Sequence, residues 1–307
     1  MRFSIKHLIL SSFCLLMMLP SLQAQRQLGS KPMGNGQPGS AGKSFDHIEG
    51  TYAVVNGINM YYEQYGEGDP ILLIHGNGGS TESFDGQIAF LSRKYKVIVA
   101  DSRGQGRSTN NADSLTYELM AEDFYLFLEQ LELDSVNIVG WSDGGIIGLI
   151  LARDYPEKVK KLVAVGANLR PDTTAVSEAL LDWTRMKMEQ AQDSVAAGKK
   201  SFATEEMLMR LMLHHPNIDV ADLHDIKAPV MVVAGDHDLI KVTHTVEIYE
   251  NLPHAQLAIY PGATHNLMLE SPQLFNNAVL RFFSRPYVAK DPMSVMLDTP
   301  SKNNDEE

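Results

Sequence analysis

Cysteine is almost absent from this chain, because Cys14 is the only one among its 307 residues. It lies within "LILSSFCLLMML" (residues 8–19), an apolar stretch close to the N-terminus that is typical of an export signal. If that stretch is removed, no cysteine remains, which excludes disulfides, thiolate nucleophiles and cysteine-bound metals together. Phe13 stands where a lipoprotein signal requires a small residue, so we do not expect lipidation of Cys14.

Positive charge is also scarce. The chain has 26 Lys and Arg against 38 Asp and Glu, which gives a formal net charge of −12 at pH 7. A chain of this balance lacks the basic surface that nucleic acids and anionic lipids require, and we expect no nucleic-acid partner. Hydrophobic residues at 44% and charged residues at 21% are typical of a globular protein, and the length fits one large α/β domain.

No hydrophobic run reaches the roughly 20 residues that a comfortable membrane span needs. Arg2 and Lys6 precede the apolar stretch, and residues 20–24 form a plausible cleavage region. Residues 1–24 are therefore expected to be a signal peptide that makes the protein periplasmic or secreted, with no stable membrane insertion after cleavage. The alternative is an uncleaved N-terminal anchor.

Residues 25–45 are rich in Gly, Ser, Pro and Gln and are expected to form a flexible tether, whereas residues 287–307 are expected to be a disordered tail. Between them, residues 46–286 alternate strand-like and helix-like segments, the pattern of a mostly parallel sheet flanked by helices. Asn56-Gly57 predicts a hairpin. Strands are predicted at 70–75, 96–100, 136–140, 161–167, 229–235 and 255–261, and helices at 81–93, 116–131, 144–154, 243–252 and 272–284.

One interval, residues 169–226, contains no strand candidate and predicts a helical lid inserted between two strands. Five methionines lie in it: Met186, Met188, Met207, Met209 and Met212. They are expected either to line an apolar pocket as adaptable side chains or to pack as ordinary helix residues.

The sequence Gly140-Trp141-Ser142-Asp143-Gly144 places a serine between two glycines, directly after a strand-like run and before a helix-like one. Glycines allow a bend sharp enough to present the serine oxygen clear of the backbone. Serine also needs a base and an acid. His265 follows the last predicted strand, and Asp236 and Asp238 follow the strand before it, so we assign Ser142, His265 and Asp238 as a triad. Asp236 is expected to brace its turn.

An oxyanion formed at the serine would need fixed donors. We expect these to be the backbone N–H groups of Asn77 and Asp143, with Gly76, Gly78 and Trp141 contacting the substrate. The glycine-rich loop at 76–80 could alternatively bind phosphate, but it has no lysine in the position that a P-loop requires. The mechanism needs neither metal nor cofactor.

With these motifs, the chain resembles the α/β-hydrolase-fold enzymes over about residues 50–285. The resemblance includes His75-Gly76, "DSRGQGRS" (101–108) and "ARDYPEKVKKLVAVGAN" (152–168). Haloalkane dehalogenases and epoxide hydrolases of this fold use an aspartate nucleophile, so Ser142 disfavours both. The fold implies a hydrolase but leaves the substrate open.

Within that superfamily, "GWSDGG", "GAN" and "THNL" are similar to the valacyclovir hydrolase (biphenyl hydrolase-like) group, which cleaves α-amino acid esters. The resemblance implies that Asp143 receives the substrate ammonium; alternatively, Asp143 only interacts with the helix dipole and points to solvent. We expect a serine hydrolase acting on small carboxylic esters. A lactonase, a C–C bond hydrolase, an aminopeptidase or a non-catalytic ligand-binding protein are the alternatives, and the oligomeric state is open.

Overall fold

A central sheet of eight strands carries the fold, in the order β1-β2-β4-β3-β5-β6-β7-β8. The structure is a computed structural model that describes residues 45–289 and 293. β1 and β2 pair antiparallel with their neighbours, and all later strands are parallel, which confirms the predicted α/β fold. The strands are β1 (Thr51–Val55), β2 (Ile58–Tyr65), β3 (Pro70–Ile74), β4 (Lys96–Ala100), β5 (Val136–Trp141), β6 (Val159–Val165), β7 (Val230–His237) and β8 (Ala255–Thr264).

The hairpin between β1 and β2 forms where the sequence predicted it. Asn56 and Gly57 have φ angles of 46° and 75°, the positive values that a two-residue type I′ turn requires at both positions. The central strands β3, β4 and β5 are buried on both faces, whereas the edge strand β8 is largely exposed. Successive side chains of a strand point to opposite sides of the sheet, so a buried central strand contributes to both apolar layers. In β3, for example, Leu73 packs into one apolar layer and Leu72 into the other.

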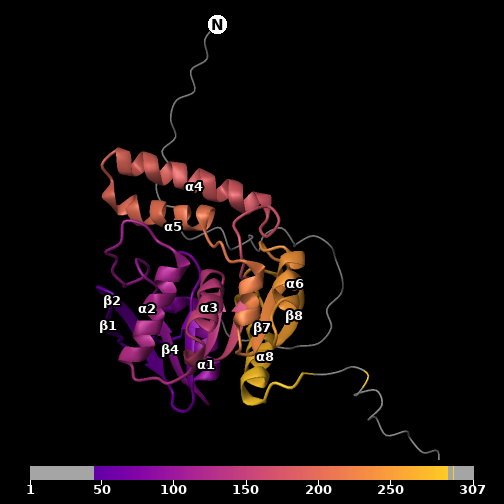
Figure 1. Ribbon diagram of the computed structural model, residues 1–307. Helices are drawn as coiled ribbons and strands as arrows, with labels where there is room; N and C mark the ends of the chain where they lie inside the picture. Colours follow the sequence, from indigo (N-terminus) through magenta and orange to yellow (C-terminus); the bar gives the residue numbers. More distant parts are fainter. Residues whose placement is uncertain (1–44, 290–292, 294–307) are drawn as a thin grey trace, which may run out of the picture. The chain divides into compact units, whose positions relative to one another are not determined.

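Helices cover both faces of this sheet (Figure 1). Side chains of α2, α3 and α6 form one apolar layer, and those of α1, α7 and α8 form the other. The helices are α1 (Asp85–Leu91), α2 (Tyr117–Gln130), α3 (Asp143–Asp154), α4 (Glu178–Ala196), α5 (Ala203–His214), α6 (Val242–Glu250), α7 (Leu267–Glu270) and α8 (Pro272–Ser284). The helix predicted over 81–93 is shorter than expected, because a 3₁₀ turn at Thr81–Phe84, capped by Ser80, replaces its first turn. The short α7 was not predicted.

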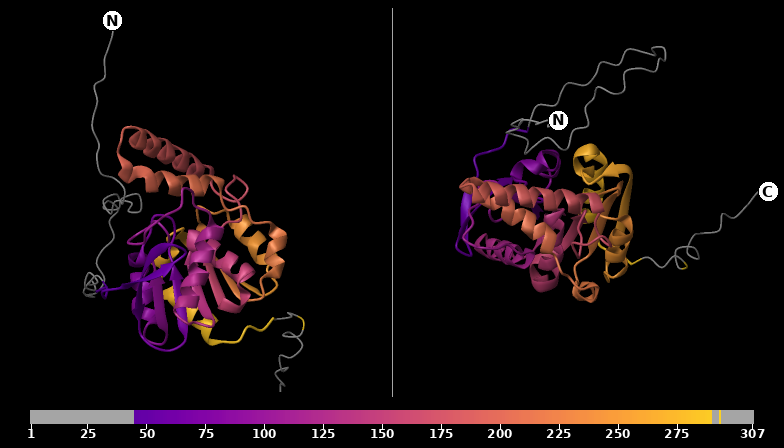
Figure 2. Two further views of the ribbon diagram at one scale, coloured as in Figure 1. Left: turned by 60° about the vertical axis from the view of Figure 1, so that its left-hand side comes forward. Right: turned by 90° about the horizontal axis from the view of Figure 1, so that it is seen from above.

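The inserted interval is helical, as predicted. Figures 1 and 2 show α4 and α5 lying side by side beyond the edge of the sheet where the parallel strands end. Met209 is buried in the apolar layer of α2 and α3, so ordinary packing accounts for it. Met186 is 43% exposed and lines nothing in the interior.

The expected signal peptide (1–24) lies outside the described residues, as do the tether except Phe45 and most of the expected tail. Within the part of the chain that the structure describes, no helix combines the length and apolar character that crossing a membrane requires.

The "DSRGQGRS" segment is held by a buried ion pair. Arg103 donates through Nε to Asp123 of α2 at 2.6 Å, and both side chains are almost fully buried. Breaking such a pair leaves an uncompensated buried charge. We expect Asp123→Asn to lower the free energy of unfolding by about 3–5 kcal/mol in urea denaturation. The exposed neighbour Glu122 is the matched control, and an equal effect of Glu122→Gln would contradict this account.

Candidate active site

The bend between β5 and α3 presents Ser142 in a strained conformation. Its φ of 56° and ψ of −117° are unusual for a residue with a side chain. The flanking glycines are required by close packing: a Cβ on Gly140 would lie 2.0 Å from the Gly144 oxygen, and a Cβ on Gly144 would lie 1.9 Å from the Ile74 oxygen. A side chain at either position would clash with the backbone, so the bend requires glycine at both.

Three side chains from three strand ends meet at this bend. The hydroxyl of Ser142 lies 3.0 Å from His265 Nε2, and His265 Nδ1 lies 2.6 Å from Asp238 Oδ1. An ionised carboxylate can only accept, so Nδ1 carries the proton and Nε2 is left to accept from the serine hydroxyl. The residues are 123 and 27 positions apart in sequence, and the parallel sheet brings them together at the carboxyl ends of its strands.

The structure distinguishes the two candidate acids. Asp238 has a fully buried side chain, and its Oδ1 also accepts from the Ile240 N–H at 3.0 Å. Asp236 is 40% exposed in its side chain and accepts from the Gly262 N–H at 2.7 Å. Asp238 therefore contacts the imidazole, whereas Asp236 bonds to the Gly262 N–H of β8, where the pairing of β7 with β8 is irregular.

Two further residues hold the imidazole in place. Gly166, with φ at 58°, leaves room for the ring, since a Cβ there would lie 2.7 Å from His265 Cε1. Trp141 donates through Nε1 to the His265 carbonyl at 2.9 Å. Trp141 was expected to contact the substrate; the structure shows this bond to the histidine backbone, a role that the sequence analysis missed.

Two backbone N–H groups belong to residues near Ser142, because Asp143 follows it in sequence and Asn77 follows Gly76, which packs against it. Within residues 45–289 and 293, neither the Asn77 N–H nor the Asp143 N–H donates to another protein group. Gly76 allows this approach, because a Cβ on it would lie 2.9 Å from Ser142 Cβ. The Gly78 N–H is taken by Gln105 Oε1 at 2.6 Å, so it is not a free donor.

The carboxylate of Asp143 is buried, so the alternative in which this side chain points to solvent is wrong. The residue is 4% exposed. Its Oδ1 accepts from the Tyr117 hydroxyl at 2.8 Å, and its Oδ2 accepts from Asn77 Nδ2 at 3.0 Å. Burial raises the pKa of Asp143 above its ordinary value, and the two hydrogen bonds act in the opposite direction.

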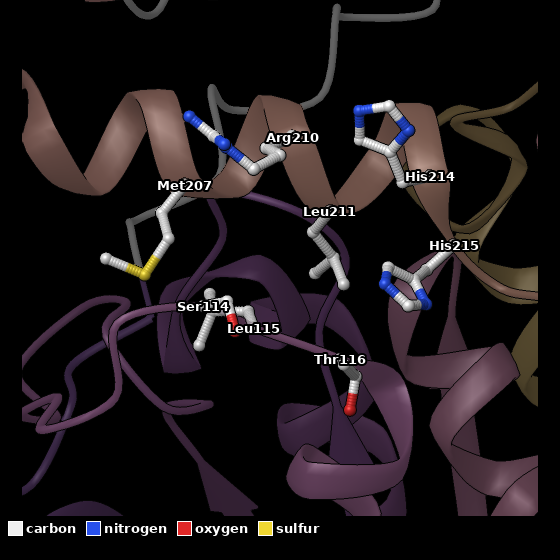
Figure 3. A pocket seen from close by; sticks show the side chains of 8 residues that line it. All are labelled: Ser114, Leu115, Thr116, Met207, Arg210, Leu211, His214 and His215. Atoms are coloured by element: carbon white, nitrogen blue, oxygen red, sulfur yellow. The ribbon is translucent and has the colours of Figure 1, made fainter.

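The lid reaches the same group of residues. Asn77 Nδ2 lies 3.5 Å from the Leu208 carbonyl of α5. Beside this contact is a cavity of about 100 Å³ between α5 and the segment that leads into α2 (Figure 3). Met207 and Leu211 point from α5 toward that segment. Residues of the triad do not line the cavity, which is lined by Ser114, Leu115, Thr116, Met207, Arg210, Leu211, His214 and His215.

In the described part of the chain, no group of three or more His, Cys, Asp or Glu side chains is placed to hold a metal ion. The contacts from Ser142 through His265 to Asp238 can activate the serine hydroxyl as a nucleophile.

Known proteins resemble the chain in both sequence and structure. The model of the alpha/beta hydrolase fold family matches residues 69–205. The serine hydrolase BPHL of Homo sapiens is 31% identical over 239 residues, covering 72% of this chain and 82% of that protein. RutD of Caulobacter sp. (strain K31), named for carbamate hydrolysis, is 30% identical over 262 residues, covering 73% and 96%.

Among solved structures, the enol-lactonase from Burkholderia xenovorans LB400 superposes with a TM-score of 0.63 at 22% identity. The match covers 76% of this chain and all of that one, and at this identity it concerns the fold. The similarity to BPHL extends over most of both chains. The fold of this chain agrees with that of the enol-lactonase. This chain therefore belongs to the α/β-hydrolase fold family and is a hydrolase that resembles the serine hydrolase BPHL.

Proposed function

We propose that this hydrolase cleaves carboxylic esters through an acyl-enzyme formed on Ser142. The observation that carries the proposal is the chain of hydrogen bonds from Ser142 through His265 to Asp238. A serine hydroxyl becomes a nucleophile when a base accepts its proton and a carboxylate orients that base. The purified protein should hydrolyse p-nitrophenyl acetate, and complete inactivity on short acyl esters would contradict the proposal.

In the proposed reaction, Ser142 Oγ attacks the ester carbonyl carbon while His265 Nε2 takes the hydroxyl proton. Asp238 stabilises the imidazolium that results. The oxyanion of the tetrahedral intermediate accepts from the N–H groups of Asn77 and Asp143, because such a charge is stabilised by backbone donors. Collapse breaks the bond to the alcohol, and His265 returns the proton to the leaving oxygen.

Water then enters in place of the alcohol. His265 accepts a proton from it, the hydroxide attacks the acyl carbon, and Ser142 recovers its proton as the acid leaves. Water is the only reactant added in this step, and each proton moves through the same imidazole nitrogen.

We further propose that the acyl part of the substrate carries an α-ammonium that binds the Asp143 carboxylate. The carboxylate stands next to the nucleophile, is buried, and still has acceptor capacity after its bonds from Tyr117 and Asn77. A substrate cation would compensate a negative charge that otherwise lies close to a developing oxyanion. A neutral acyl group would leave that charge uncompensated.

Replacing Asp143 with asparagine tests this substrate class. We expect the ratio of kcat/KM for valine benzyl ester to that for 3-methylbutanoic acid benzyl ester to fall about 100-fold, because the variant loses a buried charge pair. The two esters differ only in the amino group, so their ratio isolates its binding. An unchanged ratio would mean that Asp143 does not receive the ammonium.

Carbamates are the second candidate substrate class, because RutD is named for their hydrolysis and is 30% identical to this chain. A carbamate carbonyl could be attacked by the same serine. Measuring turnover of a phenyl carbamate beside the matched esters distinguishes the two classes. Lactone and aminopeptide substrates belong in the same panel, and a protein that binds esters without turning them over would be a ligand-binding protein.

Export is also a proposal, and it rests on the sequence of residues 1–24 alone. The basic start, the apolar run and the small residue Ala24 support cleavage by a signal peptidase. Mass spectrometry of the protein from the culture or periplasm should find Gln25 at the N-terminus. An intact N-terminus in the membrane fraction would favour the anchor instead.

A further inference from the structure

Tyr117 is a buried side chain that the proposed reaction does not use. It is the first residue of α2 and is fixed there because Thr116 caps the helix by accepting from the Leu119 N–H. Its ring is 1% exposed and packs within the apolar layer shared by α2 and α3. The only polar atom of this side chain donates to Asp143 Oδ1 at 2.8 Å. The apolar packing therefore fixes the position of a single donor next to the site.

The direction of this hydrogen bond is set by the ionisation of both partners. Burial raises the pKa of Tyr117 well above its ordinary value, and the negative charge of Asp143 raises it further. The hydroxyl therefore keeps its proton throughout the ordinary pH range and always donates. A donor to the ionised form of a carboxylate favours that form, so Tyr117 opposes the effect of burial on Asp143.

The same contact also sets where the carboxylate can accept a substrate group. An ionised carboxylate has about four acceptor positions on its two oxygens. Tyr117 takes one on Oδ1, and Asn77 takes one on Oδ2. One oxygen is bonded by α2 and the other by the loop after β3, so the carboxylate cannot rotate without losing a hydrogen bond. Its unused acceptor positions therefore keep one orientation.

We propose that Tyr117 is a specificity-determining positioning residue, whose hydroxyl holds Asp143 in the orientation that receives a substrate α-ammonium. This inference rests on the proposed function, because it assigns the source of selectivity at the same site. Tyr117 acts through Asp143 and touches neither the scissile bond nor the triad. Without the hydroxyl, Asp143 loses one of its two fixed donors, and its carboxylate becomes easier to protonate and to rotate.

Tyr117→Phe removes only the hydroxyl and tests the proposal. We expect the kcat/KM ratio between valine benzyl ester and 3-methylbutanoic acid benzyl ester to fall roughly tenfold, mainly through the KM of the amino ester. The ratio should be followed between about pH 4.5 and 6.5, where the substrate amine is fully protonated. Selectivity needs ionised Asp143, so it is lost as the pH falls, and in the variant that loss should occur at higher pH.

Two controls separate this role from a merely structural one. Tyr125→Phe removes a hydroxyl from the same helix, where the ring stacks on Tyr155 away from Asp143, and should leave the ratio and its pH profile as in the wild type. In an Asp143→Asn background, Tyr117→Phe should have no further effect on the ratio. Circular dichroism and thermal unfolding confirm that each variant is folded.

The possible results separate the role of Tyr117 from the ammonium site at Asp143. A wild-type ratio that exceeds one, is abolished by Asp143→Asn and is unchanged by Tyr117→Phe would overturn the role of Tyr117 alone. A ratio near one in the wild type would overturn both the ammonium site and this role, while ester hydrolysis would stand. A Tyr117→Phe variant that fails to fold is replaced by Tyr117→Met, an adaptable apolar side chain with no hydrogen-bond donor, which should lower the ratio in the same way.

Discussion

Ser142→Ala should reduce kcat for p-nitrophenyl acetate by about 10⁴- to 10⁶-fold, the loss typical of removing a serine nucleophile. Alanine keeps the backbone bend and removes only the atom that would bond to the acyl group. The Asn77 and Asp143 N–H groups remain, so a small residual rate over that of water is expected. Steady-state kinetics at saturating ester measures the effect.

A serine far from the site provides the control. Ser284 ends α8, and its hydroxyl donates to the Arg281 carbonyl at 3.4 Å. Ser284→Ala should retain the wild-type rate. Turnover by Ser142→Ala within about tenfold of the wild type would show that another group is the nucleophile.

Asp238→Asn should lower kcat by a factor on the order of 10⁴. The amide can donate to His265 Nδ1, which favours the tautomer that carries its proton on Nε2 and cannot accept from Ser142. Because the side chain is fully buried and also accepts from the Ile240 N–H, water cannot easily replace the lost carboxylate. The imidazolium of the reaction would then lack a counter-charge.

Asp236→Asn is the matched control, because Asp236 lies two residues before Asp238, near the end of β7. Its carboxylate accepts from the Gly262 N–H and is partly exposed, so its loss should change kcat by less than about threefold. If Asp236→Asn proved the more damaging substitution, the triad drawn here would be wrong in its acid.

The fold could be predicted from local sequence because its central strands are buried on both faces. Continuous apolar runs such as residues 97–100 and 230–234 are typical of buried strands, and Asn56-Gly57 is an explicit turn signal for the first hairpin. The helix type of the turn at Thr81–Phe84 was harder to predict, since the choice between an α-turn and a 3₁₀ turn depends on the Ser80 cap and on neighbouring loops. Short elements such as α7 have too few residues to show a period.

The site was partly predictable for a related reason. Strand ends of a parallel sheet converge, so the positions of Ser142, Asp238 and His265 follow from the strand pattern and the order of the residues. The contacts of the Asp143 side chain could not be predicted from the strand pattern. Tyr117 looks like one more apolar position of an amphipathic helix, and only the packing of α2 against α3 brings its hydroxyl to the carboxylate.

The side chain of Asn77 is a similar case. The sequence assigned its backbone N–H to the oxyanion, but the glycine-rich loop gave no indication of where its amide would point. In the folded chain the amide joins Asp143 to the Leu208 carbonyl of the lid. One residue thus connects the oxyanion loop, the carboxylate beside the nucleophile and helix α5.

The central claim is that Ser142 is the one activated hydroxyl of this protein. A fluorophosphonate reacts covalently with such a serine, and peptide mapping by mass spectrometry identifies the residue that carries the adduct. We predict a single adduct on the peptide that contains Ser142, absent from Ser142→Ala and formed much more slowly in Asp238→Asn. An adduct on a different residue, or equal labelling of Ser142→Ala, would contradict the account.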